Sequence, residues 1–239
     1  MAVLPDLLHD WILSPLRALA FPPLCPACGR TLADDSPALC PGCQELLEAA
    51  RLSAEALRRL RFSVRGDDAL DDLLVHAYFE RNSPLQALIH RLKYQGGVAV
   101  GRNLGVQLGG LLARELSGST CTGLIPVPLH RARLRERGYN QAAVIAEGVR
   151  SVLPLPLLDA LLVRPRATET QTGLAAAARR RNVAGAFSVR AGAEALVYGG
   201  TFLILDDVVT TGATLEACAR TLKASGAARC VGGAVALAR

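Results

Sequence analysis

Apolar and polar residues follow one another in blocks that predict strands interleaved with helices. The apolar run at 202–205, "FLIL", is short and bounded by turn residues, as expected of a strand covered on both faces. Residues 84–97, "PLQALIHRLKYQGG", instead place apolar side chains at helical spacing and end at two glycines, which predicts a helix and its terminus. This alternation predicts an α/β fold with a mostly parallel central sheet flanked by helices and joined by right-handed crossovers.

The same patterns predict further elements along the chain. Helices are expected at 101–116, 140–153 and 214–227, and strands at 73–79, 123–127, 185–189, 201–207 and 230–239. A strand end followed by a long polar loop is expected at 161–182. The apolar patches of residues 1–20 predict a short amphipathic helix, docked on the body of the protein or lying on a membrane surface. No stretch has the roughly 18 apolar residues of a spanning helix, and the N-terminus does not resemble a signal peptide.

Four of the seven cysteines fall within one short segment, "CPACGRTLADDSPALCPGC". Cys25 and Cys28, then Cys40 and Cys43, form two CxxC pairs separated by eleven residues. Each pair predicts a tight knuckle that aims two thiolates at one point, so the two knuckles predict a tetrahedral zinc site. Four thiolates leave no position for water, which makes the expected zinc structural. Disulfides are the alternative, but nothing marks the chain for export, and we expect metal and a cytoplasmic location.

Two adjacent acids, Asp206 and Asp207, directly follow the apolar strand in "LILDDVVTTGATL". The loop from Thr210 to Thr214 then leads into residues of helical composition. Open α/β sheets bind ligands at the carboxyl ends of their strands, and the N–H groups of a helix N-terminus favour an anion. The pattern therefore predicts a ligand with both hydroxyls and a phosphate. A helix-capping turn is the alternative, although Ala217 stands where a capping box has an acid.

The net charge of +6 comes from arginine, because Lys93 and Lys223 are the only two lysines among 27 basic residues. Guanidinium groups bind phosphate oxygens two at a time, so their density suits a polyphosphate or a nucleic-acid backbone; a solvated basic surface is the alternative. The chain has no GxxxxGK[ST] motif, which disfavours a phosphate-loop nucleotide hydrolase. The arginines concerned lie between 131 and 181: Arg131, Arg133, Arg135, Arg137, Arg164, Arg166, Arg179, Arg180 and Arg181.

The motif "LILDDVVTTGATL" resembles the ribose-phosphate motif of type I phosphoribosyltransferases, which use 5-phosphoribosyl 1-diphosphate (PRPP). The cysteine knuckles, "LKYQGG", "PVPLHRARLRERGYNQ" and "TETQTGLAAAARRRNVAGAF" resemble the competence protein F (ComF) family, also called GntX-like, in the expected order over nearly the whole chain. The resemblance implies a type I phosphoribosyltransferase fold in residues 73–239. It also implies an N-terminal helix and four-cysteine zinc module in 1–50 and a helical linker or hood in 51–72.

The same resemblance implies PRPP and Mg²⁺ as ligands and assigns roles to individual residues. Asp206 and Asp207, the implied catalytic pair, would accept hydrogen bonds from the ribose hydroxyls, directly or through Mg²⁺. The 5-phosphate would lie in the loop of Thr210, Thr211, Gly212, Ala213 and Thr214. The pyrophosphate would lie against Leu129, His130, Arg131 and Arg137, and Arg179, Arg180 and Arg181 would belong to a flexible loop that closes over PRPP. A general-base role for His130 is weighed against a surface or packing role.

Three functions are compatible with this resemblance. The first is phosphoribosyl transfer from PRPP to an unknown acceptor. The second is a non-catalytic accessory of DNA uptake in competence, which binds single-stranded DNA or a helicase partner. The third is a regulator that senses PRPP. Aromatic residues make up 4% of the chain, and stacking usually holds single strands, so the sequence supports DNA binding through charge alone.

Overall fold

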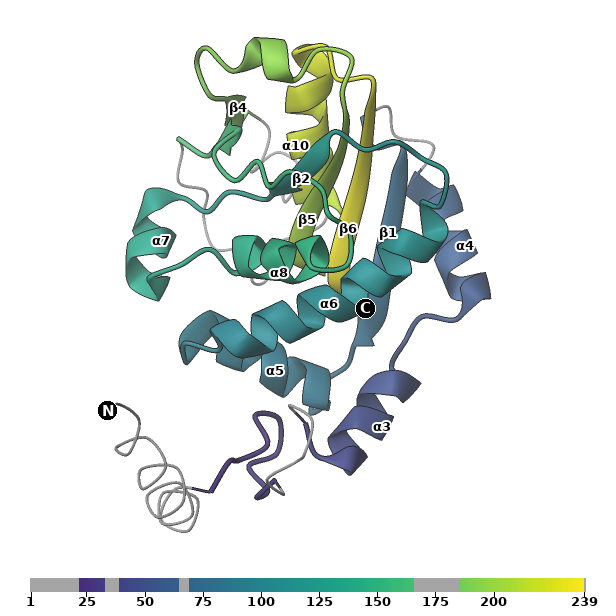
Figure 1. Cartoon of the computed structure of the whole chain (residues 1–239), viewed down its shortest axis with the longest axis vertical. Coiled ribbons are helices and arrows are strands. Elements are labelled where there is room, and N and C mark those ends of the chain that lie inside the picture. Colours follow the sequence, from purple (N-terminus) through teal and green to yellow (C-terminus); the bar gives the residue numbers. More distant parts are fainter. Residues whose placement is uncertain (1–21, 33–38, 65–68, 166–184, 239) are drawn as a thin grey trace, which may run out of the picture.

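The computed structural model describes residues 22–32, 39–64, 69–165 and 185–238 (Figure 1). Over these ranges a parallel sheet forms the centre, and helices cover both of its faces. No helix in these ranges is long and apolar enough to cross a lipid bilayer. The predicted helix in residues 1–20 lies outside the described residues, as do Arg166, Arg179, Arg180 and Arg181.

The central sheet has four strands in the order β1-β6-β5-β2, and every neighbouring pair runs parallel. Both faces are covered, which explains the continuous apolar runs: the four residues Phe202 to Leu205 are all 0% exposed. The parallel sheet predicted from the sequence is therefore confirmed. The strands are β1 (Asp72–Phe79), β2 (Gly123–Pro126), β5 (Thr201–Val209) and β6 (Arg229–Ala238).

Two hydrophobic clusters lie on the two faces of the sheet. Leu203 and Leu205 of β5 belong to the cluster under α5 (Pro84–Tyr94), α6 (Val98–Glu115) and α8 (Gln141–Arg150). Phe202 and Ile204 belong to the opposite cluster, which includes α10 (Ala213–Ala224). The antiparallel pair β3 (Leu162–Val163) and β4 (Ser188–Val189) and the short 3₁₀ helix η2 (Glu194–Leu196) lie on the α10 side. Alternate residues of β5 therefore pack into different hydrophobic clusters, one on each face of the sheet.

Glycines allow α6 and α8 to pack backbone to backbone. A Cβ at Gly105 would lie 2.1 Å from the carbonyl oxygen of Ile145, and a Cβ at Gly148 would lie 2.1 Å from that of Arg102. Neither position can hold a side chain without moving the helices apart. This contact fixes α8, and with it the loop that leads into α8 from β2.

The region before β1 contains α3 (Pro41–Ala49) and α4 (Ala54–Val64). Arg61 of α4 donates from Nε and Nη2 to the two oxygens of the fully buried Asp72 at 2.9 and 2.6 Å, and from Nη1 to Glu115 at 2.9 Å. This forked contact joins the helical linker to β1 and α6. Figure 1 shows α3 and the cysteine segment at the same end of the molecule as α5.

Three details differ from the sequence-based expectations. α7 (Arg131–Arg137) is a helix that the apolar pattern did not predict, because none of its residues is buried. The strand expected at 185–189 is reduced to the two residues of β4. β5 continues to Val209, two residues beyond the expected 201–207, so Asp206 and Asp207 lie inside the strand rather than at its very end.

Candidate functional site

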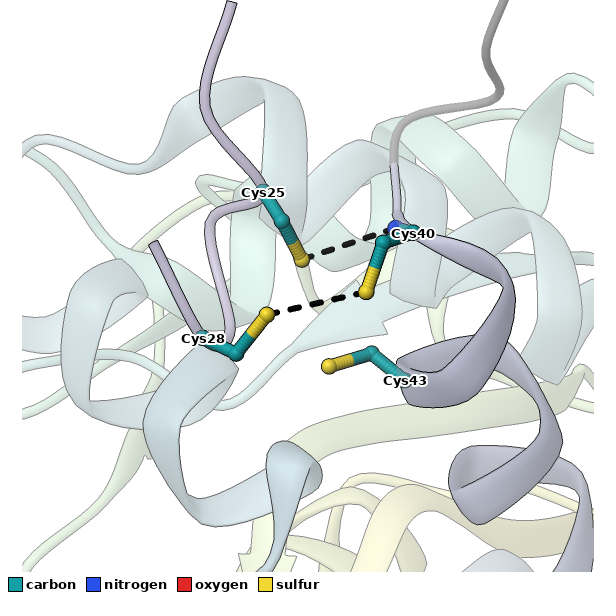
Figure 2. A group of neighbouring side chains, drawn as sticks. All are labelled: Cys25, Cys28, Cys40 and Cys43. Atoms are coloured by element: carbon teal, nitrogen blue, oxygen red, sulfur yellow. Dashed lines mark hydrogen bonds between the residues drawn. The ribbon is translucent and has the colours of Figure 1, made fainter. Parts of the chain in front are cut away.

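The first candidate site is the cysteine cluster beside α3. Cys25 and Cys28 belong to the first knuckle, where Gly29 turns the backbone at a φ of 74°, and Cys40 is the N-cap residue of α3, which contains Cys43. The four sulfurs lie within 4.8 Å of one another and point toward a common centre (Figure 2). A tetrahedron with Zn–S bonds of about 2.3 Å places sulfurs about 3.8 Å apart. The Cys28 and Cys40 sulfurs are 3.6 Å apart, so the cluster has the dimensions to hold a tetrahedral metal ion.

Backbone N–H groups of the cluster lower the pKa of one of its thiols, that of Cys25. Burial raises the pKa of Cys25, but the N–H groups of Cys40, Cys28 and Ala27 outweigh it and lower the pKa to about 6. Burial and the neighbouring thiols raise the pKa of Cys43. Four thiolates within 4.8 Å of one another would repel, so a cation between them would stabilise the cluster.

The second candidate site lies at the carboxyl end of β5. Because Asp206 and Asp207 are consecutive residues of a strand, their side chains point to opposite faces of the sheet. Asp207 is 4% exposed, and Nζ of Lys93 on α5 lies 2.5 Å from its Oδ2. Burial raises the pKa of Asp207, but the Lys93 ammonium outweighs burial and holds the pKa below its usual range. Asp207 is thus a buried carboxylate with its own cation.

Asp206 is half-buried on the α10 side of the sheet. Its Oδ1 accepts a hydrogen bond from the backbone N–H of Asp207 at 2.8 Å. Burial, and after it the charge of Asp207, raise the pKa of Asp206 well above its usual range. Burial lowers the pKa of Arg164, and the nearby charge of Asp206 acts against this effect. The Arg164 guanidinium also lies 5.3 Å from the centre of the Phe187 ring, so the residues around β3 and β4 bring a cation toward Asp206.

The loop from Thr210 to Thr214 forms the N-terminus of α10. Gly212 is the N-cap residue, with a φ of 76°, and no side chain caps the helix. A Cβ at Gly212 would meet nothing within 4 Å, so the backbone angle rather than space calls for glycine. Thr210 is exposed, and Thr211 and Thr214 are half-buried. The loop therefore offers hydroxyls and uncapped N–H groups at a helix N-terminus, as an anion site requires.

The loop after β2 lies beside this site because β2 pairs with β5. The N–H of Val127 donates to the Leu205 carbonyl at 2.8 Å, and the Asn140 side chain donates to the Val127 carbonyl at 3.0 Å. His130 is the N-cap residue of α7, where its Nδ1 accepts from the N–H of Ala132 at 3.3 Å. His130 thus has a structural role in this structure. Leu129 is half-buried and Arg131 is exposed.

Residues in the last turn of α5 contact both the segment after β2 and Asp207. The Arg137 guanidinium lies 5.4 Å from the centre of the Tyr94 ring and donates to Gln141 at 2.8 Å. The Tyr139 hydroxyl donates to the Leu92 carbonyl. Arg137 and Tyr139 thus hold the end of α7 against α5, next to the lysine that contacts Asp207.

Sequence reasoning did not name Lys93 as a site residue, and it considered Arg164 only as part of a basic stretch. Lys93 lies in the motif "LKYQGG" and is one of only two lysines in a chain rich in arginine. Its rarity and its place in that motif could have marked it as a site residue. Its partner Asp207 is 114 positions away in the numbering, so no local pattern joins them. Arg179, Arg180 and Arg181, predicted to form a flexible loop, lie outside the described residues and stay a prediction.

Comparison with known proteins identifies relatives along most of the chain. Residues 102–239 match the family described as the phosphoribosyl transferase domain. The chain is 30% identical over 199 residues to Competence protein F of Haemophilus influenzae. This match covers 79% of this chain and 85% of that protein. It is 32% identical over 227 residues to DNA utilization protein YhgH of Salmonella typhimurium, covering 91% of this chain and 92% of that protein.

Solved structures match the chain at lower sequence identity. A structure described as the allosteric regulatory enzyme of purine biosynthesis matches with 17% identity and a TM-score of 0.38. The match covers 61% of this chain and 29% of that enzyme's chain, so this chain spans less than a third of its length.

Proposed function

This chain belongs to the phosphoribosyl transferase domain family, in the ComF branch, and from that membership we propose that it binds PRPP and transfers the phosphoribosyl group to a nitrogen acceptor. One observation carries the proposal: Asp206 and Asp207 lie near the carboxyl end of β5, a few residues before the uncapped N-terminus of α10. Acceptors for two hydroxyls and donors for a phosphate are thus held at one sheet edge. The vicinal diol and the 5-phosphate of a single sugar require such a pair of sites.

The residues of the site divide the work of the proposed reaction. The acceptor nitrogen forms a bond to C1 of the ribose, the C1–O bond breaks, its electron pair leaves with pyrophosphate, and the acceptor proton is released. Asp206 and Asp207 hold the ribose hydroxyls while positive charge develops on the sugar ring. The loop from Thr210 to Thr214 holds the 5-phosphate, and the amides after β2, with Arg131 and Arg137, oppose the charge of the leaving group.

Magnesium fits this site through one carboxylate rather than two. Asp206 and Asp207 point to opposite faces of β5, and Lys93 already contacts Oδ2 of Asp207. A single ion can therefore take Asp206 together with PRPP oxygens, which matches the usual Mg²⁺ shell of one or two carboxylates plus substrate phosphates. When bound, Mg²⁺ neutralises charge on the pyrophosphate group.

The cysteine cluster fits a structural zinc ion. Four sulfur ligands fill a tetrahedral shell, and their spacing suits Zn–S bonds. Zinc would join the knuckle of Cys25 and Cys28 to α3 and so order the module that lies against α5.

Calorimetric titration of PRPP with Mg²⁺ into the zinc-loaded protein tests the proposal. Replacing both acids, Asp206→Asn with Asp207→Asn, should weaken binding at least about 100-fold, because two hydrogen bonds to charged groups are lost. Glu147→Gln, which removes an exposed ion pair with Arg102, is the control and should bind as the wild type does. A folded wild type that binds no PRPP refutes the proposal. Binding without pyrophosphate release for any acceptor supports the PRPP-sensing function instead.

A second function, binding of single-stranded DNA, is favoured by a different observation. The relatives are named for competence and DNA utilization, and Arg131 and Arg135 are exposed on α7 beside the candidate site. Replacing both with alanine should reduce the slope of log affinity against log salt by about 1.4 for a labelled oligonucleotide, since each phosphate contact contributes about 0.7. Arg59→Ala on α4, where the arginine side chain is 80% exposed, is the control. An unchanged slope in the α7 variant would remove this support.

A further inference from the structure

Lys93 is the cation of α5 that reaches the end of the central sheet. It lies in the last turn of the helix, and its Nζ lies 2.5 Å from Oδ2 of Asp207. Gly96 then takes a φ of 67°, and the backbone N–H of Gly97 donates to the Arg91 carbonyl at 3.2 Å, so α5 ends beside the site. The motif "LKYQGG" thus terminates a helix and places a lysine next to the acidic pair.

The residues on either side of Lys93 contact the segment after β2. The Leu92 carbonyl accepts a hydrogen bond from the Tyr139 hydroxyl. The Arg137 guanidinium lies 5.4 Å from the centre of the Tyr94 ring. This segment includes the proposed pyrophosphate site, whereas the carboxylate that Lys93 contacts belongs to the proposed ribose site. The last turn of α5 therefore joins the two halves of the site.

The Lys93 ammonium has donors left for a ligand. An ammonium carries three N–H donors. Among the described residues, Asp207 is the one acceptor that contacts it, and the Lys93 side chain is 23% exposed, so a ligand can reach it. Nε of Arg137 is also buried without a hydrogen-bond partner among these residues. Two cations at this end of α5 therefore have unused donors, as expected where an anion binds.

A cation at this place would distinguish PRPP from ribose 5-phosphate. Both sugars carry the ribose hydroxyls and the 5-phosphate, so the acidic pair and the loop before α10 would contact them alike. The pyrophosphate on C1, which only PRPP has, lies on the side of the segment after β2 in the proposed site. Asp207 is 4% exposed and holds the ammonium in place before a ligand arrives, so little ordering of the lysine is needed on binding.

We propose, on the premise of the PRPP binding described above, that Lys93 is a substrate-binding residue that bridges the ribose and pyrophosphate halves of the site. Its ammonium keeps its contact with Asp207 and donates a second hydrogen bond to a pyrophosphate oxygen. Binding thereby becomes selective for the sugar that carries a pyrophosphate on C1. In the proposed transfer the same ammonium opposes the negative charge that grows on the leaving pyrophosphate.

Calorimetric titration of the zinc-loaded protein with PRPP, ribose 5-phosphate and inorganic pyrophosphate, each with Mg²⁺, tests this role. Lys93→Met should weaken binding of PRPP and of pyrophosphate about 10- to 100-fold, because a hydrogen bond to a charged group is lost. The ratio of the PRPP affinity to the ribose 5-phosphate affinity should fall at least about tenfold for the same reason. Lys223→Met, which removes the chain's other lysine and its ion pair with Asp71, is the control and should leave all three affinities unchanged.

A second variant keeps the test decisive if Lys93→Met is unstable. Lys93→Met combined with Asp207→Asn removes the uncompensated carboxylate, and the affinity ratio should still fall. Equal losses of PRPP and ribose 5-phosphate in both variants, or unchanged pyrophosphate binding, would show that Lys93 acts only through the fold or through Asp207, and would overturn the proposal. A wild type that binds pyrophosphate but no PRPP refutes the proposed function and this role with it. A wild type that binds PRPP with a ratio that Lys93→Met leaves unchanged refutes the role of Lys93 alone.

Discussion

Replacing Lys93 with methionine removes the cation from a buried carboxylate and keeps most of the side-chain length. Nζ lies 2.5 Å from Oδ2 of Asp207, and the two side chains are 23% and 5% exposed. Removing one partner of a buried ion pair costs about 3–5 kcal/mol, because the remaining charge is left uncompensated. Water reaches Lys93, so we expect the lower end, about 3 kcal/mol. At about 2–4 °C per kcal/mol for a protein of this size, the melting temperature should fall by about 6–12 °C.

Urea and thermal unfolding at pH 7 measure this loss, and the chain's other lysine provides a matched control. Lys223 lies 2.9 Å from Oδ2 of Asp71, and these side chains are 28% and 36% exposed. The two lysines are about equally covered, so the difference lies in the carboxylates, and Lys223→Met should cost at most about 1 kcal/mol. Lys93→Met combined with Asp207→Asn should lose about 2 kcal/mol less than the sum of the single losses. Equal losses for the two lysines, or strictly additive losses in the double variant, would refute this account of Asp207.

Other features of the structure make separate predictions. Gly212→Ala should lower the free energy of unfolding by about 1–2 kcal/mol, because the φ of Gly212 is 76°. Gly110 lies in an open position of α6, so Gly110→Ala should raise the free energy of unfolding by about 0.5–1 kcal/mol. Urea unfolding of the two variants compares these effects. Burial and nearby arginines lower the pKa of His76 to about 4. As the pH falls from 6.5 to 4, the unfolded chain binds a proton at this histidine that the folded chain does not bind. The free energy of unfolding should therefore decrease by about 3 kcal/mol over this range. His76→Gln should flatten that part of the pH profile, and an unchanged profile contradicts the assignment. Cys28→Ser should abolish zinc binding as measured by metal analysis, while Cys121→Ser should retain one zinc ion per chain; metal retained by Cys28→Ser argues against the four-cysteine site.

Sequence patterns predicted the sheet because both of its faces are buried. In an α/β protein, a short apolar run such as "FLIL" is typical of a strand that is buried on both faces. The glycine and threonines after it indicate a turn into a helix. The helix α7 was missed for the opposite reason. Its one leucine, Leu134, is 43% exposed, so no apolar stripe records it, and the caps at His130 and Gly138 define its ends instead.

The ion pair between Lys93 and Asp207 could not be predicted from local patterns at all. It depends on β1 and β5 being held in one sheet by β6, and on α5 packing over the face to which Asp207 points. The cysteine cluster shows the contrary case, since its spacing alone predicted that four sulfurs would meet. Residues in one short segment can be joined by their spacing, whereas residues on separate elements are joined by the tertiary fold.

The adjacency of Asp206 and Asp207 separates their charges rather than joining them. In a loop, neighbouring carboxylates could turn toward one ion, but in β5 they alternate across the sheet. Asp207 then has the Lys93 ammonium on the α5 side, and Asp206 has Arg164 nearby on the α10 side. Since the cation keeps Asp207 ionised while burial raises the pKa of Asp206, the two acids differ chemically although the sequence writes them as a pair. A sugar bound at the end of this strand would therefore meet two carboxyl groups with different neighbours, Asp207 beside Lys93 and Asp206 near Arg164.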